Sequence, residues 1–340
     1  MIEISNPKEL YSAPVVSVVM LAYNHQDYIE QAIEGVLSQV FAFPIELIVA
    51  EDCSTDATRT IAQKYVGSHP HCVRIITGES NVGMMPNFFR ALEHCRGEFI
   101  GLCEGDDWWC DPIKVHLQVD LLRQNPEMGM VHTDFRNATL RNNIWCLDVV
   151  SAHHGVAEAA LSGDMFAILL RKLSVRTCTT IYRKQVIDKF LSSPLANPHY
   201  SAGDLPLALY CAANWKIGYI DRVMSVYRIA PGSVTRSGLS STVKFMEGVA
   251  DIFRDLRLIY GNRHDFTLVG EKSALSIMAK AAFRAGDIEA LNRALRRREE
   301  VDPASRLLLP FVALKLVTFF PMTQAILNRL INSLRLLRQG

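Results

Sequence analysis

The sequence lacks the charge excess and the cysteine spacing that would point directly to a nucleic-acid or zinc-binding protein. Lysine and arginine total 36 and aspartate and glutamate 35, so the net charge is +1. A nucleic-acid partner is not expected, because it would require a broad basic surface. The eight cysteines form no CxxC pair. They are expected to be free thiols in a reducing, cytoplasmic compartment.

Long apolar segments and glycine-rich phosphate loops are also missing. The N-terminus, MIEISNPKEL, has no basic region followed by an apolar stretch, so no secretory signal is expected. The most apolar run, residues 307–320, is interrupted by Pro310 and Lys315 and is shorter than the roughly 20 residues of a membrane-spanning helix. No GxGxxG follows Leu21, which argues against a dinucleotide dehydrogenase. The segment AYNHQDY has neither glycine nor lysine, which argues against a nucleotidyltransferase.

The sequence does contain alternating apolar runs and amphipathic segments. Hydrophobic residues make up 49% and charged residues 21% of the 340 residues, as in a globular protein. Strands are expected at residues 15–21, 45–51, 73–77, 98–103 and 128–133, with helices at 28–38, from 54 towards 65, and from 86 to 95. This alternation predicts an α/β fold with a mostly parallel sheet flanked by helices.

The pattern weakens between residues 136 and 156, where a polar loop around RNNIW is expected. A strand at 179–182, a helix opening near Asp204 and two short strands at 216–220 and 223–227 follow. Beyond Ser240 the sequence is typical of helices, including a helical hairpin that turns at Gly286–Asp287.

Polar residues follow several of the expected strands. They are Ala22-Tyr23-Asn24 after the first strand, Glu51-Asp52 after the second, and Glu104-Gly105-Asp106-Asp107 after the fourth. Ligands of such sheets bind at the carboxyl ends of the strands. Two unit charges about 4 Å apart repel by roughly 4 kcal/mol at an effective dielectric near 20. The acidic cluster must therefore be protonated, be solvated or hold a cation.

Three segments, VVSVVMLAYNHQDYIEQAIEGVLSQ, ELIVAEDCSTDAT and FIGLCEGDDWW, resemble in this order the inverting nucleotide-sugar glycosyltransferases of family 2. The resemblance covers residues 14 to about 235 and implies a GT-A fold. It makes the acidic triplet a DXD-type motif with Glu104 at its first position. It further implies that Asp106 and Asp107 contact the donor ribose and a Mg or Mn ion, which prefers carboxylate oxygens. The alternative is a solvated loop or an acidic start to the helix opened by Asp111-Pro112.

The resemblance also implies a pocket for the nucleotide-sugar. Asp52 would hydrogen-bond the base, and the pocket would be lined by Ala22, Tyr23, Asn24, Asn81, Gly83, Glu104 and Asp106. Alternatively, Asp52 only caps the loop before the next helix, and Gly83 is only a turn residue.

Asp204, in SAGDLPLALYCA, matches the late acidic motif of the family, which implies a general base for the acceptor hydroxyl. The alternative is an N-cap, with Pro206 in the first turn. Many members carry a histidine where this chain has Ala230, so phosphate contacts could instead come from Arg228, Arg236 or Ser233. Thr177 and Arg183 are candidates for the acceptor side. His132 is expected to be structural.

These inferences predict a catalytic domain at residues 1–238 and a helical region at 239–340. Residues 305–340 could pack on protein, which is favoured, or lie on an anionic membrane surface. The expected activity is metal-dependent, inverting sugar transfer from a nucleotide-diphospho-sugar, UDP-linked first, to a glycan, lipid-linked or small-molecule hydroxyl in bacterial envelope glycan synthesis. The alternative is a catalytically silent nucleotide-sugar-binding scaffold. A homo-oligomer and a position at the inner face of the cytoplasmic membrane are open possibilities.

Overall fold

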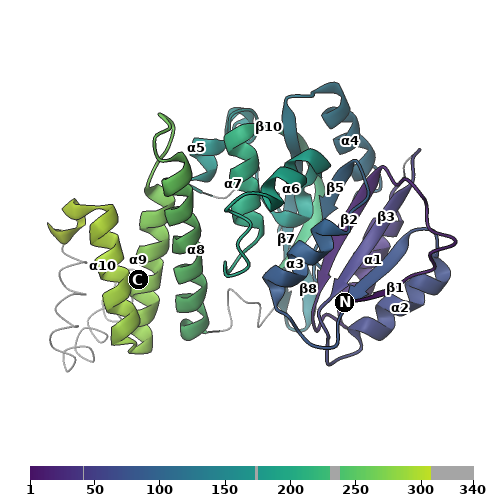
Figure 1. Cartoon of the computed structure of the whole chain (residues 1–340), viewed down its shortest axis with the longest axis horizontal. Helices are drawn as coiled ribbons and strands as arrows, with labels where there is room; N and C mark the ends of the chain where they lie inside the picture. The colour runs from purple at the N-terminus through teal and green to yellow at the C-terminus, as the bar shows by residue number, and fades with distance from the viewer. Residues whose placement is uncertain (41, 173–174, 230–237, 308–340) are drawn as a thin grey trace. The chain divides into compact units, whose positions relative to one another are not determined.

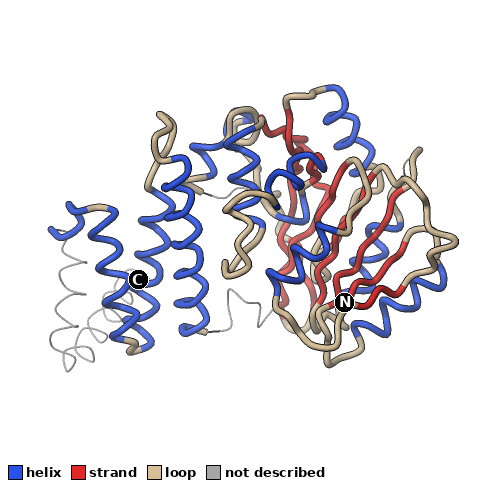
Figure 2. Tube along the Cα trace, in the orientation of Figure 1, coloured by secondary structure: helices blue, strands red, loops and turns tan. Residues whose placement is uncertain are grey.

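The computed structural model describes residues 1–40, 42–172, 175–229 and 238–307 (Figure 1). The chain divides into two compact units, residues 1–230 and 231–340. The first unit carries the β-sheet and its covering helices, and the described part of the second unit is helical (Figure 2).

The first unit is organised around one sheet that, over the described residues, contains ten strands. Along the sheet the order is β1-β4-β3-β2-β5-β9-β7-β10-β6, with β8 beside β7. Parallel pairing joins β2 to β3 and β5, β3 to β4, and β7 to β10. The predicted mostly parallel sheet is confirmed. The strands are β1 (Ile2–Ile4), β2 (Val16–Ala22), β3 (Ile45–Glu51), β4 (Val73–Thr77), β5 (Phe99–Leu102), β6 (Trp108–Trp109), β7 (Met128–Arg141), β8 (Ile144–Leu147), β9 (Ile181–Arg183) and β10 (Lys216–Ile229).

Helices cover the sheet, as expected for strands that read as continuous apolar runs. Every residue of β3, IELIVAE, is buried. The helices of this unit are α1 (Ile29–Leu37), α2 (Thr58–Ser68), α3 (Met84–Glu93), α4 (Lys114–Gln124), α5 (Phe166–Leu169), α6 (Lys184–Leu191) and α7 (Asp204–Asn214), with short 3-10 turns η1 (Glu158–Ala160) and η2 (Thr177–Thr179).

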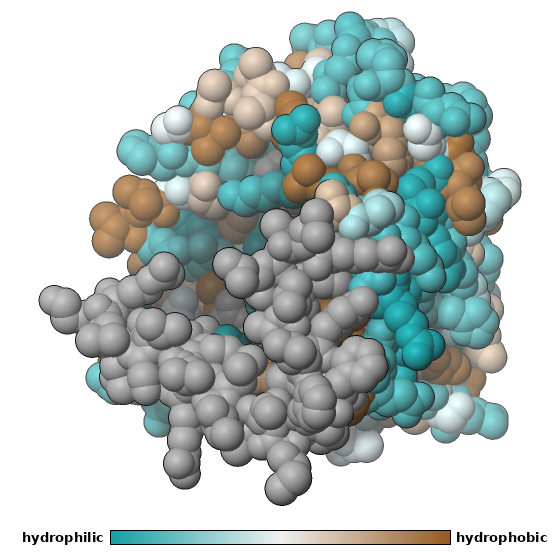
Figure 3. All heavy atoms as spheres, turned by 90° about the vertical axis from the view of Figure 1, so that its left-hand side faces the viewer, coloured by the Kyte–Doolittle hydropathy of each residue, from teal (hydrophilic) through white to brown (hydrophobic). Residues whose placement is uncertain are grey.

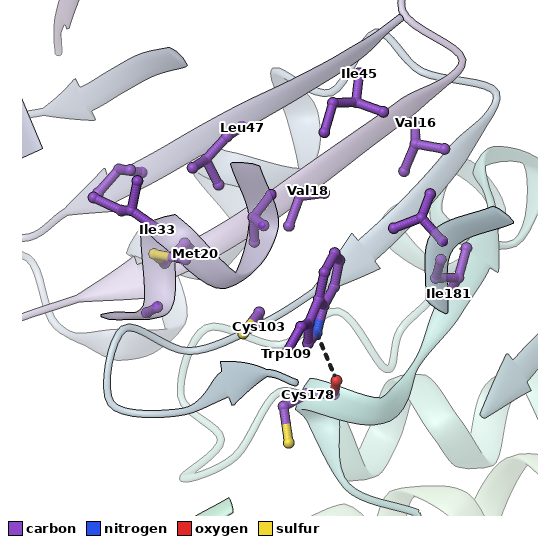
Figure 4. Close-up of a cluster of buried hydrophobic side chains, with 14 of the residues drawn as sticks. Val16, Val18, Met20, Ile33, Ile45, Leu47, Cys103, Trp109, Cys178 and Ile181 are labelled. Atoms are coloured by element: carbon purple, nitrogen blue, oxygen red, sulfur yellow. Dashed lines mark hydrogen bonds between the residues drawn. The ribbon is translucent and has the colours of Figure 1, made fainter. Parts of the chain in front are cut away.

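A hydrophobic cluster joins the central strands to the segment that carries the acidic triplet (Figure 4). Trp109, which is 2% exposed, lies in this cluster, and its indole N–H donates to the carbonyl of Cys178 at 2.8 Å. Helix α1 approaches the same segment closely, because a Cβ on Gly35 would lie 2.7 Å from the carbonyl oxygen of Trp109. The core therefore fixes the residues immediately after Asp107.

A buried ion-pair network ties together three strands of the sheet. Glu46 on β3 is fully buried and accepts hydrogen bonds from Ser17 Oγ at 2.5 Å, Arg74 Nη1 at 2.8 Å and Arg96 Nε at 2.8 Å. A Cβ on Gly97 would lie 2.4 Å from the backbone nitrogen of Ser17. Only glycine can therefore connect this network to β5 without a backbone shift.

Two sequence-based expectations for the second half of the sheet are wrong. The expected polar loop around RNNIW is a β-hairpin, in which β7 extends to Arg141 and pairs with β8. Asn142 and Asn143 have φ of 50° and 61°, and two positive φ values are what a type I′ turn requires. The two expected short strands are one strand, β10, whose register against β7 shifts around Asp221–Arg222. These two polar residues interrupt the apolar pattern without ending the strand.

The second unit contains helices α8 (Leu239–Tyr260), α9 (Val269–Ala285) and α10 (Ile288–Val301) and a 3-10 turn η3 (Pro303–Leu307) among its described residues. The predicted helical hairpin is confirmed, since Gly286 ends α9 with φ 74° and the Asp287 side chain accepts from Ala290 N at 2.9 Å. Hydrophilic side chains are interspersed with apolar ones on the face shown in Figure 3. Up to residue 307, every described helix is too short or too polar to cross a bilayer. Most of the 305–340 segment lies outside the described residues.

Candidate active site

The carboxyl ends of β2 and β3 form the first wall of the site. The backbone N–H of Asp52 donates to the carbonyl of Ala22 at 2.9 Å. Asn24, at φ 55°, accepts from Thr55 N at 2.9 Å through its side-chain oxygen. The two loops are therefore joined side by side, and Tyr23 in the first of them is 44% exposed.

Asp52 organises the loop that begins helix α3. Its carboxylate, which is 3% exposed, accepts from the backbone N–H of Val82 and of Gly83, each at 2.9 Å. The side-chain amide of Asn81 donates to the Asp52 carbonyl at 3.0 Å. The structure thus brings Asp52, Asn81 and Gly83 together. Gly83 has φ 89°, a conformation that favours glycine. Each carboxylate oxygen retains a second lone pair for a ligand.

The acidic triplet lies on a tight turn packed against the end of β2. Gly105 N donates to the carbonyl of Leu21 at 2.8 Å, and Asp107 N donates to the carbonyl of Glu104 at 3.1 Å. A Cβ on Gly105 would lie 2.8 Å from His25 Nδ1. Glycine at this position therefore lets three carboxylates follow the strand within four residues.

The carboxylates repel one another in a poorly solvated environment. Burial, followed by the charges of Asp106 and Asp204, raises the pKa of Glu104 to about 8. Burial, followed by the charges of Asp106 and Glu104, raises the pKa of Asp107 well above its usual range. Among the described residues, Glu104 Oε2 is buried without a hydrogen-bond partner. Glu104 and Asp107 therefore favour their protonated forms unless a positive charge is bound beside them.

Arg228 on β10 holds the acidic turn without an ion pair to its carboxylates. Its backbone N–H donates to Asp107 Oδ1 at 2.8 Å, and its Nη1 donates to the carbonyl of Asp106 at 2.6 Å. Its guanidinium lies 4.3 Å from the ring centre of Trp108, and it also packs on Tyr28 and Trp145 and donates to Gln31. The sequence suggested Arg228 only as a phosphate contact. The aromatic enclosure around it was missed, because it assembles residues from distant segments.

Asp204 is the first residue of α7. It lies close enough to the acidic turn for its charge to raise the pKa of Glu104. Its Oδ2 accepts from Thr177 Oγ1 at 3.1 Å, and its Oδ1 accepts from Leu205 N at 2.8 Å. Gly203, not Asp204, occupies the N-cap position. The carboxylate still helps to satisfy the start of the helix. Thr177, which the resemblance suggested for the acceptor side, is thus a direct hydrogen-bond partner of Asp204.

The remaining candidates are structural or undescribed. Arg183 donates to the carbonyls of Met128 at 2.7 Å and Asn125 at 3.1 Å, at the end of α4. The guanidinium of Arg183 therefore has a structural role at the end of α4, whereas the resemblance suggested an acceptor contact. His132 is fully buried, its Nε2 donates to the carbonyl of Leu161 at 2.7 Å, and burial lowers its pKa to about 4. Ala230, Ser233 and Arg236 lie outside the described residues.

No group of three or more histidine, cysteine or acidic side chains arranged to hold a metal ion occurs among the residues that the structure describes. The oxygen ligands at hand are those of the turn itself, Glu104, Asp106 and Asp107.

Comparison with known proteins identifies the family. The profile described as "Glycosyl transferase family 2" matches residues 17–189. Uncharacterized protein Rv1520 of Mycobacterium tuberculosis is 31% identical over 279 residues, covering 76% of this chain and 73% of that protein. The chondroitin synthase of Escherichia coli is 33% identical over 135 residues, covering 40% of this chain and 19% of that protein.

Solved structures share the fold at low sequence identity. Residues 1–349 of TarS from S. aureus, in complex with UDP-GlcNAc, superpose with a TM-score of 0.58 at 18% identity, covering 85% of this chain and 83% of that chain. The mannosyltransferase PcManGT from Pyrobaculum calidifontis, in complex with GDP-Man and Mn2+, gives a TM-score of 0.54 at 16% identity, covering 92% and 86%. The expected GT-A fold is confirmed. With its profile match and its mycobacterial relative, this chain belongs to glycosyl transferase family 2.

Proposed function

We propose that this glycosyltransferase moves a sugar from a nucleotide-diphospho-sugar to an acceptor hydroxyl with inversion at the anomeric carbon, and that it requires a divalent cation. The observation that carries the proposal is the placement of Asp204, on α7, beside the acidic turn after β5. A carboxylate suited to proton removal and a cluster suited to cation binding thus meet at the edge of the sheet where β2 and β3 also end.

The donor set at the turn fits Mg²⁺ or Mn²⁺. Glu104, Asp106 and Asp107 offer only oxygen ligands, and Glu104 Oε2 is buried without a partner among the described residues. Mg²⁺ commonly takes one or two protein carboxylates and completes its shell with phosphates and water, so a smaller protein ligand set is sufficient. We assign the cation to Asp106 and Asp107, as the sequence suggested. When bound, it neutralises charge on the diphosphate leaving group.

Asp204 is the proposed general base. Its carboxylate is oriented by Thr177 Oγ1 and Leu205 N, and each oxygen keeps a lone pair for the acceptor O–H. As the acceptor oxygen bonds to the anomeric carbon, its proton passes to Asp204 and the bond from that carbon to the diphosphate oxygen breaks. Attack from the face opposite the leaving group inverts the configuration.

We assign the donor pocket to the wall formed by Ala22, Tyr23, Asn24 and Asp52, with Asn81, Gly83, Glu104 and Asp106 completing it. The exposed ring of Tyr23 is available to stack on a base. UDP is the first donor nucleotide to test and GDP the second, because the TarS structure holds UDP-GlcNAc and the PcManGT structure holds GDP-Man. Envelope glycan synthesis is the proposed setting. A relative from Bacillus subtilis, 38% identical over 98 residues, carries the name of a teichuronic acid biosynthesis glycosyltransferase.

Asp204→Asn tests the central role. Release of nucleoside diphosphate from UDP-, GDP- and dTDP-sugars is measured with Mn²⁺ and a panel of hydroxyl acceptors. Loss of a positioned general base is expected to lower turnover by about 10²–10⁴-fold, while the thermal shift produced by UDP and Mn²⁺ persists. Asp188→Asn, at an exposed residue of α6, is the matched control.

Full turnover in the Asp204→Asn protein would refute the assignment of the base. Wild-type protein that binds UDP with Mn²⁺ but never transfers or hydrolyses a sugar would refute the enzymatic proposal and favour the scaffold alternative.

The proposed catalytic region spans residues 1–238. For residues 239–340 we propose a packing role, with membrane-surface association of 305–340 as its alternative. Cell fractionation after deletion of residues 305–340 separates the two, because a lipid-binding segment would be needed for recovery with membranes.

A further inference from the structure

A cavity of about 370 Å³ lies beside β7. Its wall comes from β7, from residues 152–161, which include η1, and from three side chains further along the chain, Ile168, Lys172 and Arg176. The volume lies within the range of about 300–1,000 Å³ usual for small-molecule sites. Part of the lining is apolar, including Phe135 and Leu161, and all of it belongs to the first unit.

The charged groups lining this cavity are cationic. Lys172 and Arg176 line it and are exposed, His153 is a third nitrogen-bearing side chain, and no aspartate or glutamate is among the lining residues. Within the described part of the chain, no ion pair involves Lys172 or Arg176. The nearby Asp134 is 3% exposed, and its Oδ1 accepts from Phe135 N at 2.8 Å and His153 N at 3.0 Å. His153 Nδ1 also lies 3.4 Å from Asp134 Oδ1, so Asp134 pairs with His153 and leaves Lys172 and Arg176 as the cationic side chains of the cavity.

Arg176 connects the cavity to the proposed base. The next residue along the chain, Thr177, donates its hydroxyl to Asp204, so the cavity wall and the partner of the base are consecutive residues. The guanidinium of Arg176 lies 4.8 Å from the ring centre of Tyr227 and 5.9 Å from that of Phe135. Such stacking restricts a long side chain and orients its planar donors.

We propose that this cavity receives the acceptor and selects one that carries an anionic group, a carboxylate or a phosphate, bound by Arg176 and Lys172. This inference rests on the proposed function. A charged hydrogen bond from a guanidinium to a carboxylate or phosphate is about twice as strong as a neutral one. The two cations are thus specificity-determining residues for an acidic sugar acceptor.

The test measures binding of three small probes to the full chain by ligand-observed NMR. The probes are methyl glucuronide, glucose 1-phosphate and methyl glucoside. Wild-type protein is expected to bind one or both anionic probes at least tenfold more tightly than methyl glucoside. The stronger of the two anions identifies the group as carboxylate or phosphate.

Variants identify the cavity as the site of this binding. Lys172→Gln/Arg176→Gln is expected to weaken anion binding at least tenfold, while Arg171→Gln, at an exposed neighbouring arginine that does not line the cavity, keeps it. The thermal shift given by UDP with Mn²⁺ is expected to be unchanged in both variants. Three results would overturn the proposal. They are equal binding of the neutral probe, full anion binding by the double variant, and loss of the UDP shift in the double variant.

A different result would refute the proposed function itself: neither UDP nor GDP with Mn²⁺ shifts the melting temperature of the wild-type protein. The probe measurements would still decide whether the cavity prefers anions.

Discussion

Replacing Lys114 with methionine should make stability respond differently to pH. Lys114 on α4 is fully buried, its ammonium donates to the carbonyl of Thr179 at 3.0 Å and to the side chain of Gln118, and it lies 4.9 Å from the ring centre of Trp109. With no carboxylate among these contacts, burial lowers the pKa of Lys114 to about 7. The folded protein therefore loses a proton that the unfolded chain retains up to about pH 10.5.

The direction and the size of the change in stability with pH follow from this difference in the pKa of Lys114. Between about pH 7 and pH 10.5 the unfolded chain binds one more proton than the folded protein, so this group makes stability rise with pH. Each pKa unit corresponds to about 1.4 kcal/mol. From pH 7, where the folded protein is half-protonated, to pH 9, the wild-type protein should gain about 2 kcal/mol relative to Lys114→Met. For a chain of 340 residues that is about 3 °C in melting temperature.

Thermal and urea unfolding at pH 7 and pH 9 measure the effect as the difference between wild type and variant. Methionine keeps the length of the side chain and its helix propensity, so the substitution removes mainly the charge and two hydrogen bonds. Lys64→Met, at an exposed position on α2, is the matched control and should show no such pH-dependent difference. A wild-type-minus-Lys114→Met difference that is the same at both pH values would refute the reasoning.

Three further predictions concern packing and positioning. Glu46→Gln removes the charge that two arginines share and should cost about 3–5 kcal/mol in urea unfolding; an unchanged midpoint would contradict the network. Gly97→Ala places a Cβ 2.4 Å from a backbone nitrogen and should cost about 1–3 kcal/mol, so a wild-type melting temperature would show that this contact relaxes freely. Thr177→Val loses the hydrogen bond to Asp204, worth about 1 kcal/mol, and should lower kcat several-fold with donor binding retained. Thr177→Ser should restore kcat, and failure to do so would argue against the positioning role.

Local signals in the sequence were sufficient for much of the fold. Apolar runs such as IELIVAE identify buried strands, and Gly286–Asp287 marks a helix end and a helix start within two residues. The extent of β10 was not predictable in this way. Asp221 and Arg222 look like a break in the sequence, but pairing with β7 continues past them because the partner strand tolerates a register shift.

For the candidate site, too, some residues could be predicted from the sequence and others could not. Acidic residues at strand ends could be placed at one edge of the sheet from topology alone, and Asp204 by its motif. The partners of these acids could not. Val82 lies 30 residues from Asp52 along the chain, and Arg228 lies 121 residues from Asp107. Only the folded chain shows that Arg228 holds the acidic turn through its backbone N–H to Asp107 and its guanidinium to the carbonyl of Asp106.

The enclosure of Arg228 couples parts of the molecule that would otherwise move separately. One guanidinium bridges the acidic turn, the helix that follows β2 and, through Trp145, the tip of the β7–β8 hairpin. Lysine lacks the planar guanidinium group and could not make these hydrogen bonds and ring contacts simultaneously. A ligand that displaces the turn must therefore carry the hairpin with it, so an indole more than 30 residues downstream becomes a natural reporter. Its fluorescence is expected to change when a ligand binds at the turn.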